Sequence, residues 1–565
     1  MPKRNERLGI FSLKCDNLNM LKEQLLALKL EGEIQDDSAS IEKYSHDASL
    51  FEVRPEVVIF PKNFSDLKKI VNFVREAKKS GEKISITARS AGTDMGGGPL
   101  NESIILDFTK YFNHIIEVGD GWAVTEPGVY YRDFEKETLK KGWLLPSYPA
   151  SRELCTVGGI AANNSGGEKT LTYGKTEKYV AELQVILDDG NEYTIKPLTE
   201  SELAAKCAQQ NFEGKFYTEI SKLIKTNDTI LKQAKPTVSK NSAGYYLWNV
   251  WDQEKKVFDL CKLFVGSQGT LGLITKIKFN LIKPASKSKM LVIFMKNMEH
   301  LGEVTNAILA QKPESFEAYD DKTLKLAIKF FPELIKRMHV GLIKLAFEFL
   351  PELGMVLSGG LPKEVAMAEF TGDNQEEVTK RAEAAQAALK KFGMKTRIVG
   401  QDEAQKYWTI RRESFNLLRN HVHGMRTAPF IDDFAVRPEF LPEFLPALNK
   451  ILSQYDIIYT IQGHLGDGNF HIIPLMDFKL PETKEIITKL SKQVYSLIIS
   501  YHGTITAEHN DGLIRSPFLE EMYGPQITGL FAETKKIFDP AGIFNPGKKV
   551  GSSWEYSLAH VVKTS

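Results

Sequence analysis

Apolar residues recur along the chain with two different spacings, and each spacing predicts one kind of element. Over residues 18–30, leucines stand three or four positions apart, as on one face of a helix. Residues 57–60 are apolar without a break and end at Pro61, which predicts a short buried strand. A helix capped by Ser65 is expected next, followed by a strand over residues 83–87. The first part of the chain therefore alternates strands with helices.

Beyond Pro284 the same patterns predict a second unit. Strands are expected over residues 290–295 and 366–371, and helices over residues 297–311 and 375–392. Units of strand, helix and strand favour an antiparallel sheet that is covered by helices. The second half of the chain is therefore expected to be an α+β unit.

Three glycine-rich segments punctuate the first half of the chain. The first, residues 88–99, follows a predicted strand, and its glycines leave amide groups able to surround a diphosphate. It has neither the GxGxxG spacing of a Rossmann site nor the GK[ST] of a Walker loop. Residues 156–167 and 264–274 again combine glycines with small and amide side chains. Each segment alone is compatible with an ordinary loop, but the three together indicate a cradle for an extended cofactor.

A glycine-punctuated stretch at residues 463–471 carries two of the protein's 11 histidines. Gly466 and Gly468 allow the chain to reverse between His464 and His471, which would bring both rings to one point. A turn whose histidines cap backbone groups has the same sequence, so the spacing leaves both interpretations open.

A second stretch, residues 507–512, places a carboxylate beside a third histidine. Glu508 can complete a metal site with His464 and His471, because imidazole and carboxylate ligands together suit zinc or manganese. His509 would then stay available as a proton acceptor.

Composition limits the class of protein. The formal net charge is +1 and basic residues do not cluster with aromatic ones, so no nucleic-acid partner is expected. The four cysteines include no CxxC pair, which fits a reducing compartment and excludes an iron–sulfur cluster ligated by this chain alone. The charged residues 1–19 predict no secretory leader, and no run of about 18 uncharged apolar residues predicts a membrane span. A cytoplasmic enzyme is the expectation.

Eight segments, taken in order, resemble one known family. They cover about residues 51–550 and read PKNFSDLKKIV, RSAGTDMGGGPL, TVGGIAANNSGG with YGKTEKYV, KNSAGYYL, VGSQGTLGLIT, GHLGDGNFH, AEHNDGLIRSPFLEEMYG and KKIFDPAGIFNPGKK. In these segments the chain resembles the vanillyl-alcohol-oxidase family, the PCMH-type FAD-linked oxidases. Within that family it resembles the D-2-hydroxy-acid dehydrogenases, a branch that includes D-lactate and D-2-hydroxyglutarate dehydrogenases and the flavin subunit of glycolate oxidase.

The resemblance implies an α+β fold, with a two-part PCMH-type FAD-binding domain and an antiparallel-sheet cap domain covered by helices. The implied division is a helical extension at residues 1–50, the FAD-binding domain at 51–283, the cap at 284–520 and a C-terminal segment at 521–565 that returns to the flavin. The cap would contain a helical insertion at about residues 324–361.

The resemblance also implies which residues contact FAD. They are Arg89, Ser90, Ala91, Gly92, Thr93, Asp94, Met95, Gly96, Pro127, Gly128, Gly158, Gly159, Ala162, Asn163, Asn164, Gly166, Gly272, Ile274 and Asn545. Relatives that bind flavin covalently use a histidine or cysteine near these loops. The first loop has neither and only Cys155 flanks the second, so non-covalent FAD is expected.

A helix expected to open at Tyr407 carries two adjacent arginines, Arg411 and Arg412. Neighbours in a helix cannot share one face, so only one of them can face inward. A planar guanidinium suits a carboxylate because its fork bonds both oxygens. The family match selects Arg411 as the residue that binds the substrate carboxylate.

The resemblance gives the remaining residues their roles in oxidising a small 2-hydroxy acid. A zinc or manganese ion on His464, His471 and Glu508 would bind the substrate hydroxyl, and His509 would take its proton. Two departures from the family are Gln268, where glutamate is usual, and Asn510-Asp511, where glycine and an aliphatic residue are commoner. An aspartate also follows the Glu-His pair in relatives that are fused to iron–sulfur domains.

The sequence predicts that electrons leave to a separate acceptor, such as a quinone, a cytochrome or another redox protein. Residues 324–361 mix apolar and basic residues, so they fit either a peripheral membrane contact or a lid or partner helix packed on the cap. A homodimer is compatible with the sequence. Two alternative functions stay open, a flavin oxidase of the same fold that acts on another alcohol and a non-catalytic electron-transfer subunit.

Overall fold

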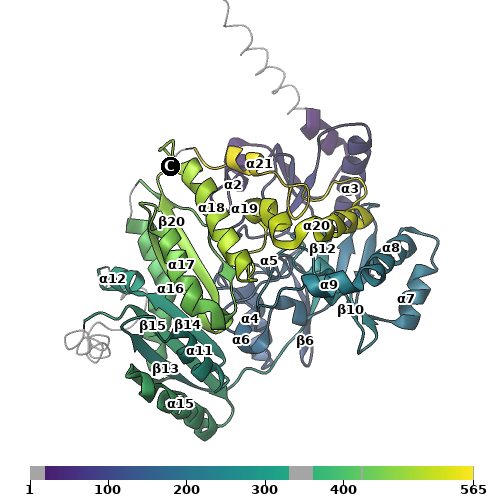
Figure 1. Cartoon of the computed structure of the whole chain (residues 1–565). Coiled ribbons are helices and arrows are strands. Elements are labelled where there is room, and N and C mark those ends of the chain that lie inside the picture. The colour runs from purple at the N-terminus through teal and green to yellow at the C-terminus, as the bar shows by residue number, and fades with distance from the viewer. Residues whose placement is uncertain (1–19, 330–359, 422–423, 564–565) are drawn as a thin grey trace, which may run out of the picture.

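Three main sheets form the frame of the molecule (Figure 1). The computed structural model describes residues 20–329, 360–421 and 424–563. In Figure 1 the cap sheet, in teal and green, lies beside the earlier part of the chain, in purple and blue. The chain passes from the earlier sheets into the cap sheet between Asn280 and Lys287.

The first sheet has the order β1-β2-β4-β3 and is parallel apart from β1. Its strands are β1 (Glu33–Gln35), β2 (Val57–Phe60), β3 (Ile86–Arg89) and β4 (Ile104–Asp107). Because β1 pairs with β2, the segment before residue 50 contributes a strand to this sheet and is not only the helical extension expected.

Helix α3 (Phe64–Lys79) connects β2 to β3 and packs Leu67, Ile70, Val71 and Val74 against the first sheet. The expected cap at Ser65 is wrong. Asn63 is the N-cap, because its side-chain oxygen accepts the amide proton of Asp66 at 3.1 Å, and Ser65 is already inside the helix.

The second sheet is antiparallel and has the order β5-β6-β12-β7-β8. Its strands are β5 (Ile115–Val118), β6 (Trp122–Thr125), β7 (Val180–Ile186), β8 (Glu192–Ile195) and β12 (Leu273–Asn280). A small sheet nearby consists of β9 (Leu198–Thr199), β10 (Trp251–Asp252) and β11 (Val257–Phe258). The helices of this half are α2 (Ser38–Tyr44), α4 (Tyr131–Lys140), α5 (Val157–Asn163), α6 (Thr170–Tyr173), α7 (Glu200–Cys207), α8 (Phe212–Thr226), α9 (Asp228–Ala234) and α10 (Cys261–Phe264).

The cap is one antiparallel sheet of eight strands, with the order β16-β13-β15-β14-β19-β20-β17 and β18 paired to β20. Its strands are β13 (Lys287–Met295), β14 (Ser315–Asp320), β15 (Glu364–Gly372), β16 (Lys395–Gly400), β17 (Arg426–Thr427), β18 (Phe434–Ala435), β19 (Ile458–His464) and β20 (Asn469–Met476). This confirms the α+β expectation for the second half of the chain.

Alternation along β13 explains why helices cover both faces of the cap sheet. Leu291 and Ile293 share a core with helices α11 (Leu301–Leu309), α15 (Gln375–Leu389), α17 (Leu441–Leu452) and α18 (Thr483–Ser500). Met290 and Val292 point to the other face, because successive strand residues alternate. There they pack with Trp408 of helix α16 (Gln401–His421). Helix α16 begins at Gln401 and not at Tyr407 as expected.

The C-terminal part of the chain returns to the first sheet. Helices α19 (Gly512–Arg515), α20 (Leu519–Phe538) and α21 (Trp554–Ala559) lead to and follow this return. Phe544 forms a parallel bridge with Ile86 of β3, and the Ile86 amide donates to the Ile543 carbonyl. The first sheet is therefore completed by a segment more than 400 residues away in sequence.

The insertion expected at about residues 324–361 is described only at its ends. Helix α12 (Asp321–Lys329) includes its first residues, and residues 330–359 lie outside the described structure. Among the described residues, no helix combines the length and the apolar character that crossing a bilayer requires.

A buried pair of carboxyls in the cap sheet predicts a pH-dependent stability. Glu364 on β15 lies opposite Asp320 on β14, and burial together with the Asp320 charge raises the pKa of Glu364 to about 8. The folded protein therefore keeps a proton here that the unfolded chain loses near pH 4.5, so stability falls as pH rises from about 4.5 to 8. We expect Glu364→Gln to remove part of this loss and to raise the melting temperature at pH 8.5 by a few degrees relative to wild type. Calorimetric scans at pH 5.5 and 8.5 check this, with Glu443→Gln, a change on the outer side of helix α17, as the control. An equal pH dependence in Glu364→Gln and wild type would contradict the assignment.

Candidate active site

The first glycine-rich segment follows β3 and has amides suited to an anion. The Asp94 carboxylate accepts hydrogen bonds from the amides of Gly96 and Gly98, at 3.1 and 2.7 Å, and from the Asn163 side chain at 2.9 Å. The amides of residues 91–95 donate to no other residue of the described chain. A run of such amides beside glycines fits the diphosphate of FAD.

Two residues expected at the cofactor hold the first loop in place. The Arg89 guanidinium donates to the carbonyls of Tyr44 and His46, and it lies over the Tyr44 ring. The Ser90 hydroxyl accepts from Thr156 at 2.6 Å and so joins the first and second segments. Contacts of Arg89 and Ser90 with FAD stay a prediction.

The second glycine-rich segment is a helix and not the loop expected. Thr156 caps α5 by accepting the amide proton of Gly159 at 3.2 Å. A Cβ on Gly158 would lie 2.5 Å from the Cβ of Pro127, so this close packing requires glycine. Helix α5 therefore stacks on the Pro127-Gly128 turn, which brings two of the expected cofactor segments together.

The third segment and the C-terminal return are joined through Asn545. Its side-chain amide donates to the carbonyls of Gly98 and Gln268, at 3.0 and 2.7 Å. Its oxygen accepts from the Thr87 hydroxyl at 2.8 Å. The unusual Gln268 accepts the amide proton of Gly512 at 2.9 Å. Beyond this junction Gly272 leads into β12, and Ile274 is already part of that strand.

The histidine-rich stretch is the hairpin between β19 and β20, which agrees with the reversal expected from its glycines. The ring centroids of His464 and His471 are 5.3 Å apart. Gly468 at the turn has a φ of +62°, and a Cβ there would lie 1.8 Å from the Val436 carbonyl oxygen. His464 Nε2 faces Glu508 Oε1 at 3.4 Å, so the three expected metal ligands converge.

Asp432 orients two of the histidine rings. It lies 3.1 Å from Nδ1 of His471 and 2.7 Å from Nδ1 of His509, and the two rings stack with centroids 5.1 Å apart. In a neutral ring, a carboxylate at Nδ1 keeps the proton on that nitrogen and leaves the lone pair on Nε2. This pattern fits a metal ligand and a neighbouring proton acceptor.

Asp433 shapes the backbone that carries the third ligand. Asp433, His471, Glu508 and His509 all offer ligand atoms within 4.8 Å of one another. The Asp433 carboxylate, however, already accepts from the Thr506 hydroxyl at 2.8 Å and from three consecutive amides of residues 507–509. We therefore assign Asp433 to the turn, which leaves His471, Glu508 and His509 of this cluster, and His464 adjoins them through Glu508.

These carboxylates change the proton affinity of the site. Burial alone would lower the pKa of His509, but Asp433 and Asp432 together raise it to about 9. Burial would likewise raise the pKa of Glu508, but Lys240 and His464 hold it well below its usual range. With a pKa of about 9, the His509 ring carries its proton at neutral pH, and the Glu508 carboxyl is ionised.

Lys240 is a member of the site that the sequence did not indicate. Its ammonium is fully buried, 2.5 Å from Glu508 Oε1 and 3.3 Å from Asp467 Oδ2. It offsets the charge of both carboxylates and holds Glu508 by one oxygen.

The two adjacent arginines of α16 face different partners. Arg411 is buried with 6% of its surface exposed, and its guanidinium contacts the Glu317 carboxylate. Arg412 turns to Glu168 of the FAD-binding half, with contacts of 2.7 and 2.8 Å, and lies over the Trp408 ring. Arg411 is therefore the one that reaches the histidine site, through Glu317.

The segment after His509 packs on the expected cofactor loops. The Asn510 side chain donates to the carbonyls of Gly266 and Asn163, at 2.9 and 3.2 Å. Asp511 accepts the Gly244 amide proton at 2.9 Å and pairs with the ammonium of Lys549 at 2.7 Å. The departure Asn510-Asp511 thus joins the segment that carries Glu508 to four other segments.

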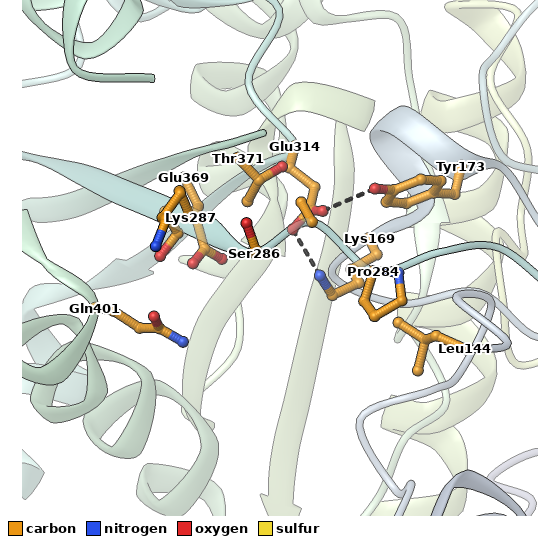
Figure 2. A pocket seen from close by; sticks show the side chains of 12 residues that line it. Leu144, Lys169, Tyr173, Pro284, Ser286, Lys287, Glu314, Glu369, Thr371 and Gln401 are labelled. Atoms are coloured by element: carbon orange, nitrogen blue, oxygen red, sulfur yellow. Dashed lines mark hydrogen bonds and ion pairs between the residues drawn. The ribbon is translucent and has the colours of Figure 1, made fainter. Parts of the chain in front are cut away.

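The FAD-binding half and the cap also meet at a polar cavity of about 100 Å³ (Figure 2). Figure 2 shows Glu314 of the cap between two residues of the other half, Lys169 at 2.6 Å and Tyr173 at 3.1 Å. Burial and the Glu314 charge raise the pKa of nearby Glu369 to about 7. Together with the Arg412–Glu168 pair, these contacts fix how the cap sits on the FAD-binding half.

Family models match most of the chain. A model described as "FAD binding domain" matches residues 55–196, and one described as "FAD linked oxidases, C-terminal domain" matches residues 284–549. The chain therefore belongs to the FAD-linked oxidoreductases that combine these two domains, as the resemblance implied.

Curated relatives carry the names of 2-hydroxy-acid enzymes. D-2-hydroxyglutarate dehydrogenase of Pseudomonas putida is 27% identical over 92% of this chain, and glycolate oxidase subunit GlcD of Bacillus subtilis is 27% identical over 94%. D-lactate dehydrogenase of Archaeoglobus fulgidus is 25% identical over 87%. The matches cover 50%, 96% and 91% of these relatives, so the chain spans about half the length of the first.

Solved structures show the same fold. The 4-ethylphenol oxidase of Gulosibacter chungangensis superposes with a TM-score of 0.64 at 15% identity, covering 93% of this chain and 95% of that one. A p-cresol methylhydroxylase superposes with a TM-score of 0.62 at 17% identity, covering 91% and 93%. The expected PCMH-type architecture is confirmed.

Proposed function

We propose that the protein oxidises a D-2-hydroxy acid to the 2-oxo acid, with non-covalent FAD as hydride acceptor and a zinc or manganese ion on His464, His471 and Glu508. Electrons then pass to a separate acceptor, such as a quinone, a cytochrome or another redox protein. The observation that carries the proposal is that Arg411 and the histidine site meet at one residue, Glu317. The names of the relatives agree with this substrate class.

The chain's own residues would divide the work. Arg411 binds the substrate carboxylate and fixes the direction of the α-carbon. In its neutral form, His509, oriented by Asp432, accepts the hydroxyl proton at Nε2. When bound, FAD supplies the acceptor for the α-hydride and the divalent ion lowers the pKa of the hydroxyl.

The environment of Cys155 supports non-covalent FAD. The thiol is buried, and burial raises its pKa to about 12. A thiol in this state provides little thiolate for attachment to a flavin.

The central test is anaerobic reduction of the FAD-loaded protein by 2-hydroxy acids. We expect D-lactate, glycolate or D-2-hydroxyglutarate to bleach the flavin absorbance, and the L-enantiomers of the chiral acids to be slower. His509→Ala should lower the rate of bleaching about 100-fold, because the proton acceptor is lost. His114→Ala changes an exposed histidine bound to Glu126 and serves as the control. If none of these acids reduces the flavin of the holoprotein, the proposal is contradicted.

Metal removal tests the second half of the proposal. Dialysis against a chelator should lower the rate of flavin reduction at least tenfold, and zinc or manganese should restore it. Glu508→Gln should remove both the bound metal, measured by elemental analysis, and the recovery. A full rate in metal-free protein would contradict the assigned ligands.

A further inference from the structure

Glu317 contacts both Arg411, the proposed anchor of the substrate carboxylate, and His464, a proposed metal ligand. Ala318 of β14 pairs with Gly463 of β19 in an antiparallel ladder, so Glu317 stands opposite His464. Glu317 Oε1 is 2.8 Å from His464 Nδ1, while Oε2 contacts the Arg411 guanidinium. Only 1% of the Glu317 surface is exposed. One buried negative charge is therefore shared between the proposed carboxylate anchor and a proposed metal ligand.

Because both residues contact one carboxylate, Arg411 and His464 compete for Glu317. A carboxylate ligand on Arg411 places a second negative charge beside Glu317 and competes for the same guanidinium. Glu317 then interacts more strongly with the Nδ1–H of His464, and a carboxylate at that position makes Nε2 a better metal ligand. A cation on Nε2 acts in reverse, because it draws Glu317 toward His464 and loosens its hold on Arg411.

We propose that Glu317 is a positioning residue that couples binding of a carboxylate at Arg411 to binding of a divalent cation at His464, His471 and Glu508. The coupling is reciprocal, because each ligand must change the affinity of the other by the same factor. The proposal rests on the proposed function, which assigns the substrate carboxylate and the metal to these residues.

The test is a titration of the metal-stripped, FAD-loaded protein with Mn²⁺, with and without saturating propionate. Propionate carries the carboxylate of a 2-hydroxy acid but lacks the hydroxyl, so it can occupy Arg411 without ligating the metal through a hydroxyl. Free Mn²⁺ is measured by electron paramagnetic resonance. We expect propionate to tighten Mn²⁺ binding about tenfold in the wild-type protein.

The informative variant is Glu317→Gln, which keeps the size of the side chain and removes its charge. It should bind propionate more tightly than wild type, because Arg411 loses a competing partner. It should bind Mn²⁺ more weakly, because His464 loses its carboxylate, and the coupling factor should fall below about 2. A residue that only supports the fold would not change the two affinities in opposite directions.

Glu168→Gln is the matched control, because Glu168 bonds Arg412 in the same way but does not contact His464. It should keep the tenfold coupling. If Glu317→Gln does not fold, Glu317→Asp replaces it, since the shorter side chain cannot contact both partners and should also lower the coupling.

The outcomes separate this proposal from the proposed function. Wild-type protein that binds both ligands with a coupling factor near 1 would overturn the role of Glu317 and leave the proposed function intact. Full coupling in Glu317→Gln or in a folded Glu317→Asp would also overturn it. Wild-type protein that binds no Mn²⁺ would overturn the metal site and the coupling together.

Discussion

We expect Arg411→Met to lower kcat/KM for 2-hydroxy acids about 1000-fold, because it removes the buried cation that we propose pairs with the substrate carboxylate. Arg411 is 6% exposed and already pairs with Glu317. A substrate carboxylate bound to Arg411 would therefore form a charged pair largely shielded from water. Steady-state rates with an artificial electron acceptor measure the change. Arg412→Met, one residue along the same helix, is the matched control, and its rate should stay within about tenfold of wild type.

A second substrate separates lost binding from lost folding. Wild-type protein should strongly prefer a 2-hydroxy acid to its neutral amide, since the amide cannot pair with Arg411. Arg411→Met should oxidise the acid and the amide with similar kcat/KM. A variant that still prefers the acid as strongly as wild type would show that another residue binds the carboxylate.

We expect Asp511→Ala to lower the free energy of unfolding by about 3–5 kcal/mol, because it leaves the ammonium of Lys549 buried without its carboxylate. Both side chains are fully buried, and the other contacts of the ammonium include the Gly244 carbonyl at 2.8 Å and the Tyr245 ring. Urea unfolding of the FAD-loaded protein, followed by circular dichroism, measures the loss.

Two further variants test this explanation for Asp511. Lys549→Met combined with Asp511→Ala should recover part of the stability, because the unpaired charge is gone. Glu76→Ala breaks the exposed pair with Lys79 and should leave the urea midpoint close to that of wild type. A loss below 1 kcal/mol in Asp511→Ala itself would show that the pair does not stabilise the fold.

The sequence was informative where chemistry and backbone shape lie in one short segment. The turn at Gly466 and Gly468 predicted that His464 and His471 would meet, and the structure brings them together. Strand β2 was also predicted with its observed limits, because a short, continuous apolar run that ends at a proline rarely forms anything other than a buried strand. Local pattern and tertiary packing agree at these positions.

The residues that the sequence missed act through distant partners. Glu317 is a single acidic residue in a buried strand, and only the pairing of β14 with β19 gives it a role. Asp432 and Asp433 are two adjacent carboxylates inside an apolar stretch, a signal for a buried polar site that the sequence analysis did not use. Helix α5 was predicted as a loop because glycine disfavours helix, but the Thr156 cap and packing on Pro127 stabilise it.

The position of Asn545 has a consequence for how the protein acquires its cofactor during synthesis. The strand that the first loop follows is flanked by Phe544, and the first and third loops are joined by the Asn545 side chain. A ribosome-bound chain that has not yet released these residues lacks one wall of the flavin cradle. We therefore expect flavin loading to follow the step in which residues 544 and 545 fold back onto the first sheet and the two loops.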